Sequence, residues 1–158
     1  MLGELNDKQI EDLLKRQVTG RIACTEANVP YIVPVNYVFD GSQIISHSTA
    51  GKKIDIMRKN PRVCFQVDEI QDIFNWQSVI ALGWFEEITV MSEKELAMTA
   101  IKNRLRLFTD RPTQYPSHGL AENEEDIGTK LELIFYKIKL VNKTGRFERN
   151  FPNFPSRL

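Results

Sequence analysis

Runs in which apolar and polar residues alternate fill the middle and the end of the chain, and such alternation predicts half-buried β-strands. Turn-forming "NVP" and "DGS" separate the first three runs, as expected for a meander of antiparallel strands. Gly83 interrupts the fifth run and predicts a bulge or bend there. The predicted strands are residues 20–27, 31–40, 42–48, 62–69 and 74–90, with residues 130–148 as a closing strand or hairpin.

The first predicted helix lies near the N-terminus of the chain. Asn6 and Gln9 have the spacing of a capping box, in which each side chain satisfies a backbone N–H of the other. The residues that follow predict a short amphipathic helix over 6–17 whose apolar face holds Ile10, Leu13 and Leu14.

Two further helices are predicted between strands. Residues 51–60 fit two turns, because Pro61 excludes the helical conformation from the residue before it. A longer helix over 92–108 begins with Ser92 and Glu95 as a second capping box. Its apolar positions are Ala97, Ile101, Leu105 and Phe108.

Residues 109–128 lack periodicity and predict a long loop, in which His118 is either solvated or part of a lid. Six strands with flanking helices predict a mainly β fold, a small antiparallel barrel or curled sheet whose closure would remove unpaired edges. With 158 residues, the chain is expected to form one domain, residues 1–158.

Composition narrows the function classes. Lys plus Arg and Asp plus Glu number 21 each, so no overall basic field attracts nucleic acid or an anionic membrane. No run approaches the about 20 apolar residues of a membrane span, and the N-terminus does not resemble a secretory signal. Cys24 and Cys64 lie in strand-like contexts without the spacing of a zinc site, which predicts a reduced, cytoplasmic protein without a metal.

The segment "SHSTAGKK", residues 46–53, has the chemistry of an anion site. It precedes a predicted helix whose first N–H groups point toward it, and Ser48 and Thr49 add donors. Lys52 and Lys53 add positive charge, so a phosphate monoester would be matched here. The alternative is a plain turn with a hydroxyl N-cap and two solvated lysines. A P-loop is excluded, because Ser46 and Lys53 stand where that motif requires other residues.

Polar residues in the neighbouring strands favour the anion site. Pro34 lacks a ladder donor, so its strand lies at an edge or a break, where backbone can meet a ligand. Asn36 and Ser78 are polar groups among large apolar residues, and core packing explains neither of them.

Four motifs follow one another between about Gly20 and Val90: "PYxxPxNY", "HSxxGKK", "NPxVCF" and "SVxxxG". In this order they resemble the pyridoxamine 5′-phosphate oxidase-like flavin-binding split barrels. The resemblance is closest to the branch of flavin-nucleotide-binding and 5-nitroimidazole-resistance proteins. It implies a six-stranded antiparallel split β-barrel with flanking helices that forms a homodimer, with FMN in the cleft between the subunits. FAD is the second choice of cofactor, and haem or a deazaflavin ranks below both.

The resemblance also implies which residues bind the cofactor. The residues that would line the flavin ring, largely through backbone, are Pro34, Val35, Asn36 and Tyr37. The residues that would hold the phosphate are His47, Ser48, Lys52 and Lys53, and those that would close the same side are Gln77 and Ser78.

The implied activity is that of an oxidoreductase acting on a small nitroaromatic or pyridoxal-like substrate. His47 is the candidate catalytic residue, although it could equally be a hydrogen-bonding group on the phosphate side. The C-terminal "GRFERNFPNFPSRL" lacks the histidine with which true pyridoxamine phosphate oxidases hold substrate, which argues against vitamin B6 oxidation. The alternative is a non-enzymatic flavin- or haem-binding or sensing module, with His47 as an axial haem ligand. An oligonucleotide-binding barrel is disfavoured by the zero net charge.

Overall fold

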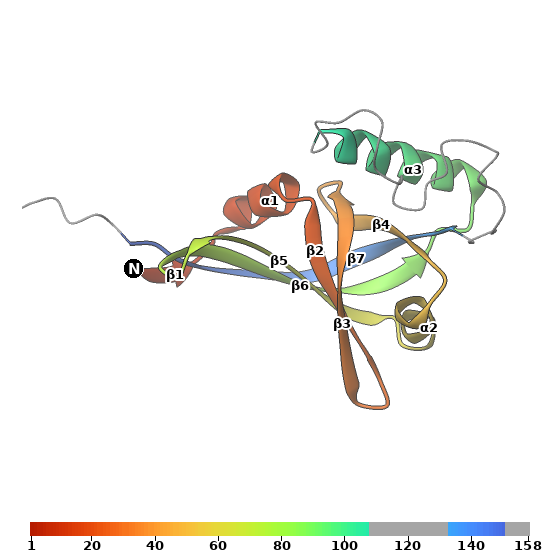
Figure 1. Cartoon of the computed structure of the whole chain (residues 1–158), viewed down its shortest axis with the longest axis horizontal. Coiled ribbons are helices and arrows are strands. Elements are labelled where there is room, and N and C mark those ends of the chain that lie inside the picture. Colours follow the sequence, from red (N-terminus) through yellow and green to blue (C-terminus); the bar gives the residue numbers. More distant parts are fainter. Residues whose placement is uncertain (108–132, 151–158) are drawn as a thin grey trace, which may run out of the picture.

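The computed structural model describes residues 1–107 and 133–150, which form a mostly β structure (Figure 1). The strands are β1 (Leu2–Glu4), β2 (Thr19–Glu26), β3 (Val29–Phe39), β4 (Gln43–Thr49), β5 (Arg62–Asp72), β6 (Asn75–Glu87) and β7 (Leu133–Glu148). The helices are α1 (Asp7–Arg16), α2 (Lys52–Lys59) and α3 (Met91–Arg106). None of these helices combines the length and the hydropathy that crossing a bilayer requires.

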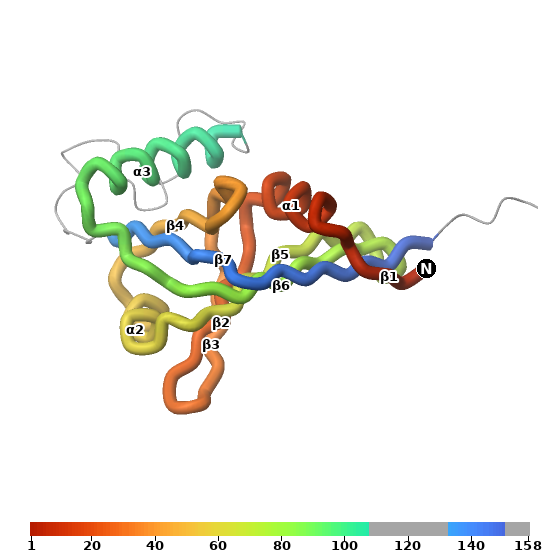
Figure 2. Tube along the Cα trace, turned by 180° about the vertical axis from the view of Figure 1, so that it is seen from behind, coloured from red at the N-terminus to blue at the C-terminus, as the bar shows by residue number. Residues whose placement is uncertain are grey.

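The strands close into a ring. Their order is β1-β7-β4-β3-β2-β5-β6, and β6 pairs back onto β7, so six antiparallel strands form a barrel as the sequence predicts. The last strand is one continuous strand rather than a hairpin, and Figure 2 shows it running the length of the molecule. The three residues of β1 add a seventh strand at the end of β7, which the sequence pattern does not predict.

Two of the predicted helix details are confirmed and one is wrong. The Asn6 and Gln9 capping box is present, and the apolar face of α1 is buried as expected. The predicted capping box of α3 is wrong, because the helix begins at Met91 and Ser92 is already its second residue. The cap position falls on Val90, whose side chain has no hydrogen-bonding atom. Phe108 and the predicted loop with His118 lie outside the described residues.

The core is divided between the inside of the barrel and the underside of α3. Inward residues of the strands pack with α1 and α2 in the larger cluster, and α3 covers a smaller one around Ile101 and Phe135. Figure 1 shows α3 outside the barrel on the side where α1 also lies. Arg104 of α3 donates to the backbone carbonyls of Lys15 and Arg16 at the end of α1, at 2.5 and 2.8 Å. The guanidinium thereby joins the two helices and satisfies carbonyls that a helix end leaves unpaired.

The barrel is split between β3 and β4. β3 pairs with β2 from Val29 to Asn36, but with β4 only at Tyr37, Val38 and Phe39. The predicted edge or break at Pro34 is therefore confirmed. The Tyr37 N–H donates to the backbone oxygen of Val18 on the β2 side. Because backbone groups alternate in direction along a strand, the N–H and C=O groups of even-numbered residues of β3 point toward the open side. Pro30 and Pro34 both fall there and have no N–H, which blunts this edge against pairing.

At Gly83, β6 lies too close to β7 for a side chain to fit. The register between these strands shifts between Leu82 and Gly83, which confirms the predicted bulge. A Cβ at position 83 would lie 2.6 Å from the backbone oxygen of Lys139, closer than real Cβ atoms approach. Glycine is therefore required by space rather than by backbone conformation.

We expect Gly83→Ala to lower the free energy of unfolding by about 1–3 kcal/mol, because the strands must move apart. Gly51→Ala is the control, since a Cβ there meets nothing within 4 Å. Urea unfolding followed by circular dichroism measures both. Equal stability of the two variants would show that β6 and β7 adjust without cost.

Candidate functional site

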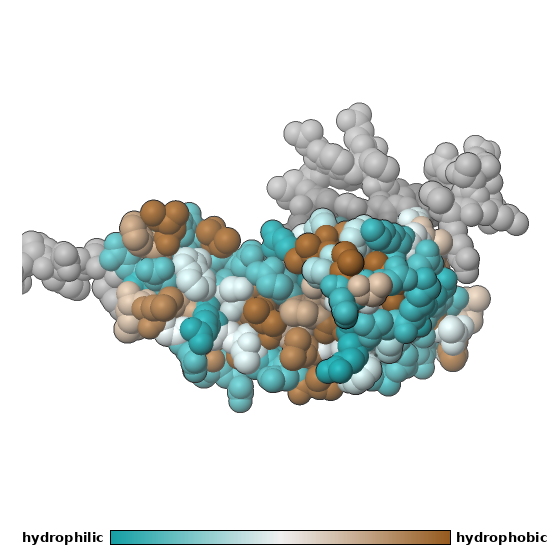
Figure 3. All heavy atoms as spheres, turned by 90° about the horizontal axis from the view of Figure 1, so that it is seen from below, coloured by the Kyte–Doolittle hydropathy of each residue, from teal (hydrophilic) through white to brown (hydrophobic). Residues whose placement is uncertain are grey.

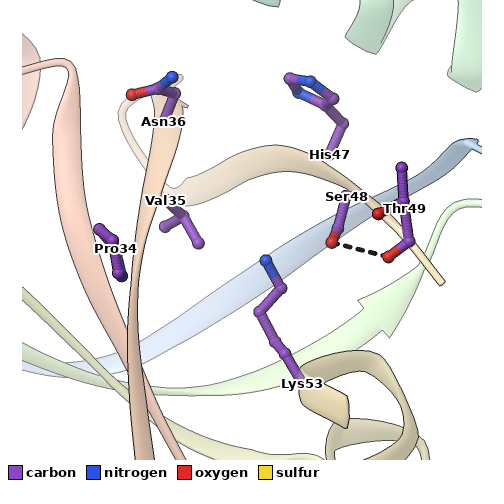
Figure 4. A pocket seen from close by; sticks show the side chains of 7 residues that line it. All are labelled: Pro34, Val35, Asn36, His47, Ser48, Thr49 and Lys53. Carbon is purple, nitrogen blue, oxygen red and sulfur yellow. Dashed lines mark hydrogen bonds between the residues drawn. The ribbon is translucent and has the colours of Figure 1, made fainter. Parts of the chain in front are cut away.

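A pocket of about 320 Å³ lies where β3 and β4 separate (Figure 4). The residues that line it are Pro34, Val35, Asn36, His47, Ser48, Thr49 and Lys53. In Figure 4, Asn36 and His47 stand on one side of the gap, and the amine of Lys53 reaches into it from α2 on the other. The pocket therefore depends on two strands that diverge and on the helix that follows β4.

Lys53 brings a positive charge into this pocket without a matching negative one. Its side chain is half-buried, and no carboxylate of the described residues forms an ion pair with it. Burial lowers the pKa of the Lys53 amine, and the nearby thiol of Cys24 opposes this shift. A bound anion would restore the interaction that water supplies to an exposed ammonium.

Packing and an ion pair fix the position of helix α2 and therefore of the Lys53 backbone. Ile54, Ile56 and Met57 of α2 are buried in the core. Arg58 donates two hydrogen bonds of 2.9 Å to the carboxylate of Glu87 on β6, in the paired geometry that guanidinium and carboxylate favour. The long side chain of Lys53 therefore projects from a fixed backbone.

The alternative of a hydroxyl-capped turn does not describe this segment. The N-cap position of α2 is Gly51, and no side chain accepts a hydrogen bond from the first turn of the helix. The Ser48 hydroxyl instead donates to the backbone oxygen of Thr49, at 2.8 Å. Neither residue therefore caps the helix, and both line the pocket.

His47 lies on the outer side of β4. Its ring is half-buried and lies 6.1 Å from the ring of Phe135, tilted by 32°. Phe135 belongs to the cluster under α3, so the imidazole is held between that cluster and the pocket. A group placed in this way can contact a ligand in the gap.

Asn36 is held from two directions. The Thr19 hydroxyl lies 2.9 Å from the side-chain oxygen of Asn36 and donates to it. The Ser46 hydroxyl donates to the backbone oxygen of Asn36 at 2.7 Å. Apart from tyrosine and cysteine, Ser46 is the one fully buried polar residue in the described part of the chain. A polar group inside an apolar barrel therefore sits at the point where the strands part.

The structure brings six of the ten sequence-predicted binding residues into the pocket. They are Pro34, Val35, Asn36, His47, Ser48 and Lys53. Lys52 lies elsewhere, with its amine 4.8 Å from the centre of the Tyr31 ring. Tyr37 points into the barrel, where burial raises the pKa of its hydroxyl and the hydroxyl donates to Leu14. The cofactor roles assigned to these residues stay predictions.

Gln77 and Ser78 lie on β6, which is separated from β3 by two strands. The path from Asn36 to Ser78 crosses β2 and β5, which is about 14 Å at normal strand spacing. Ser78 accepts from Gln66 on the outer face of the barrel, at 3.1 Å. Gln77 points to the opposite face and donates to Glu69. Neither side chain reaches the pocket of its own chain, so their predicted role needs a longer ligand or a second copy.

Three residues of the site were not among those predicted. Thr49, which the sequence predicts only as a donor in the turn, lines the pocket. Ser46 carried a signal, because its alternation with Ile44 places it inside the barrel. No signal in the sequence marks Thr19, since its contact with Asn36 arises only from the pairing of β2 with β3.

An antiparallel barrel that is split between β3 and β4 is the fold class of this protein. Residues 6–146 match the family model of pyridoxamine 5′-phosphate oxidase, and the chain belongs to that family. An uncharacterised protein of Rhizobium meliloti is 30% identical over 131 residues, which cover 80% of this chain and 82% of the relative.

Two solved structures are similar to this fold. An FAD-binding protein from Mesorhizobium loti is 28% identical, with a TM-score of 0.72 over 93% of this chain and 98% of that one. A candidate 5-nitroimidazole antibiotic resistance protein from Bacteroides thetaiotaomicron is 20% identical, with a TM-score of 0.68 over 93% and 87% of the two chains. The resemblance inferred from the motifs is thereby confirmed at the level of family and fold.

We expect the affinity of the pocket for inorganic phosphate to fall as pH rises through the lowered pKa of Lys53. The ammonium form binds the anion and predominates below that pKa, whereas the neutral amine above it does not. Conversely, bound phosphate should raise the pKa of Lys53. NMR titration of the lysine amines with and without phosphate measures both effects, and Lys53→Met assigns the signal. A Lys53 signal that titrates identically with and without phosphate would contradict this site.

Proposed function

We propose that the chain binds a flavin nucleotide, FMN, with its phosphate against Lys53 in the gap between β3 and β4. The observation that carries this proposal is the half-buried Lys53 amine, which points into a pocket without a carboxylate partner among the described residues. A phosphate monoester carries about −1.5 to −2 charges at neutral pH and offers several acceptors. Thr49 lines the pocket with a further hydroxyl, and the Ser48 hydroxyl would turn from the Thr49 carbonyl to donate to the phosphate.

The choice of a flavin is supported by the FAD-binding protein of Mesorhizobium loti, whose structure matches over 93% of this chain. FMN and FAD share the ring and the first phosphate, so the residues named here suit that shared part. The pocket of about 320 Å³ is at the small end for ligand sites, and in one copy it would hold only part of the nucleotide. Pro34 and Asn36, which line the pocket from the edge of β3, would lie along the flavin ring.

The bound flavin would supply redox chemistry, and the residues of the chain would bind and orient it. We extend the proposal to an oxidoreductase that acts on a small nitroaromatic or pyridoxal-like molecule. His47 is the residue best placed to contact that molecule or to carry a proton, because its ring borders both the pocket and the cluster under α3. Reduction of the bound flavin by NADH or NADPH, followed in a stopped-flow instrument, separates an enzyme from a flavin carrier.

A second copy of the chain is proposed as the partner that completes the site. Four residues stand side by side across four strands on the outside of the barrel, and two more flank them on β6. This outer apolar face consists of Ile32, Ala23, Cys64, Leu82, Ile80 and Trp84. Figure 3 shows apolar surface across the middle of the molecule seen from below and at the end that carries β1.

Continuity with the pocket argues for the second copy. Ile32 lies two residues from Pro34 on the same face of β3, so the outer apolar face begins where the pocket opens. Ser78 lies on that face as well, beyond the reach of its own pocket. A copy docked there would cover the apolar surface and enclose the part of the ligand that one pocket leaves exposed.

We expect Lys53→Met to weaken FMN binding by about 10–100-fold, because a charge-assisted hydrogen bond to phosphate is lost. Lys52→Met is the matched control, since the Lys52 amine lies over Tyr31 and should have the smaller effect. The absorbance spectrum of the purified protein and fluorescence titration with FMN and FAD measure the binding. A colourless protein that cannot be reconstituted with either flavin would contradict the proposal, and a Soret band would indicate haem instead.

We expect Leu82→Lys to convert a dimer into monomers, because it places a charge at the centre of the outer apolar face. Leu82 is 47% exposed in the single chain. Leu96→Lys on α3 is the control, since Leu96 is 73% exposed and lies outside that face. Sedimentation velocity measures the mass of each variant. A monomeric wild-type protein, or a dimeric Leu82→Lys variant, would exclude this interface.

A further inference from the structure

Both oxygens of Asn36 accept a hydrogen bond from a residue that does not line the pocket. Its side-chain oxygen receives the hydroxyl of Thr19, and its backbone oxygen receives the hydroxyl of Ser46. Neither neighbour lines the pocket. The donors of Asn36 are two N–H groups of the side-chain amide and one N–H of the backbone.

Those donors face the gap. Figure 4 shows the amide nitrogen of Asn36 turned toward the side on which His47 stands, with the oxygen turned away. Tyr37 N–H points to β2, so the N–H of the preceding residue points to the side where β4 separates. The strand register ends at Tyr37 and Ser46, and it does not continue to Asn36 and His47.

Thr19 and Ser46 contact Asn36 from opposite sides of the barrel wall. Ser46 is fully buried and reaches Asn36 from inside the barrel. Thr19 is exposed on β2, directly across the ladder from Asn36, and it reaches the side chain from outside. Rotation of the amide would replace the oxygen that accepts from Thr19 with the amide nitrogen, and movement of the peptide would break the bond to Ser46.

We infer that Thr19 and Ser46 are positioning residues that hold Asn36 with its N–H groups toward the gap, so that the site favours a ligand with an acceptor at that point. A ring nitrogen or carbonyl oxygen of a heterocycle provides such an acceptor. This inference rests on the proposed flavin function and deepens it: an acceptor of the bound ring lies against Asn36. Donors at this point favour the more electron-rich reduced ring, so they raise its potential.

The test compares Thr19→Val, which removes the hydroxyl at nearly constant shape, with Thr19→Ser, which keeps a hydroxyl. We expect Thr19→Val to weaken FMN binding about fivefold, as for one neutral hydrogen bond, and to lower the midpoint potential of the bound flavin. Thr19→Ser should restore both. Ser46→Ala should act in the same direction, and Thr19→Val decides the question if Ser46→Ala does not fold.

The outcomes separate this inference from the proposed function. Wild-type protein that binds no flavin would overturn the flavin proposal together with the inference. Wild-type protein that binds FMN while Thr19→Val matches it in affinity and potential would overturn the inference alone. A weakened affinity with an unchanged potential would also overturn it, because a merely structural role of Thr19 predicts that pattern.

Discussion

The separation of β3 from β4 is the constraint on which the site depends. Antiparallel strands joined by a short turn normally stay paired along their length, yet here the ladder ends after three residue pairs. Pro30 and Pro34 remove donors from the open edge, so continued pairing would leave carbonyl groups without partners. β4 instead follows β7, and the gap admits a side chain from the helix that comes next. Lys53 is accessible to a ligand only because this gap exists.

The strands beside the split are held by their other neighbours, and β7 is one of the most extensive of these. It pairs with β4, β6 and β1, so it spans the gap region and the far end of the barrel. Lys137 on β7 lies within 4 Å of Glu86 on β6 and Glu93 on α3, which ties three elements together. The opening is therefore local, and the strands on both sides of it are held by neighbours other than each other.

Local chemistry made much of the fold predictable. Alternation predicts the strands, Asn6 and Gln9 predict the start of α1, and the glycine that interrupts the run at Gly83 predicts the bulge that the register of β6 and β7 shows. The start of α3 was predicted wrongly, because Ser92 suits a cap and only the path of the chain places Val90 there. The three residues of β1 are too few to show any period.

The site was predictable as far as it lies within one segment. Lys53 and Ser48 share the turn after β4, and Asn36 stood out as a polar residue in an apolar strand. Which of two adjacent lysines enters the pocket depends on the direction of α2, which the letters "KK" do not reveal. The contact of Thr19 with Asn36 could not be predicted from the sequence, because the two residues are 17 positions apart and meet only through the pairing of β2 with β3.

Closure through β7 also fixes the order in which the protein can be completed. During synthesis β4 and β6 emerge before residue 133, and each then lacks the strand that covers its edge. Unpaired edges of this kind are sites of aggregation, and the prolines that blunt β3 protect neither of them. The barrel can therefore close only after its last strand is made, and until then the edges of β4 and β6 stay open to other chains.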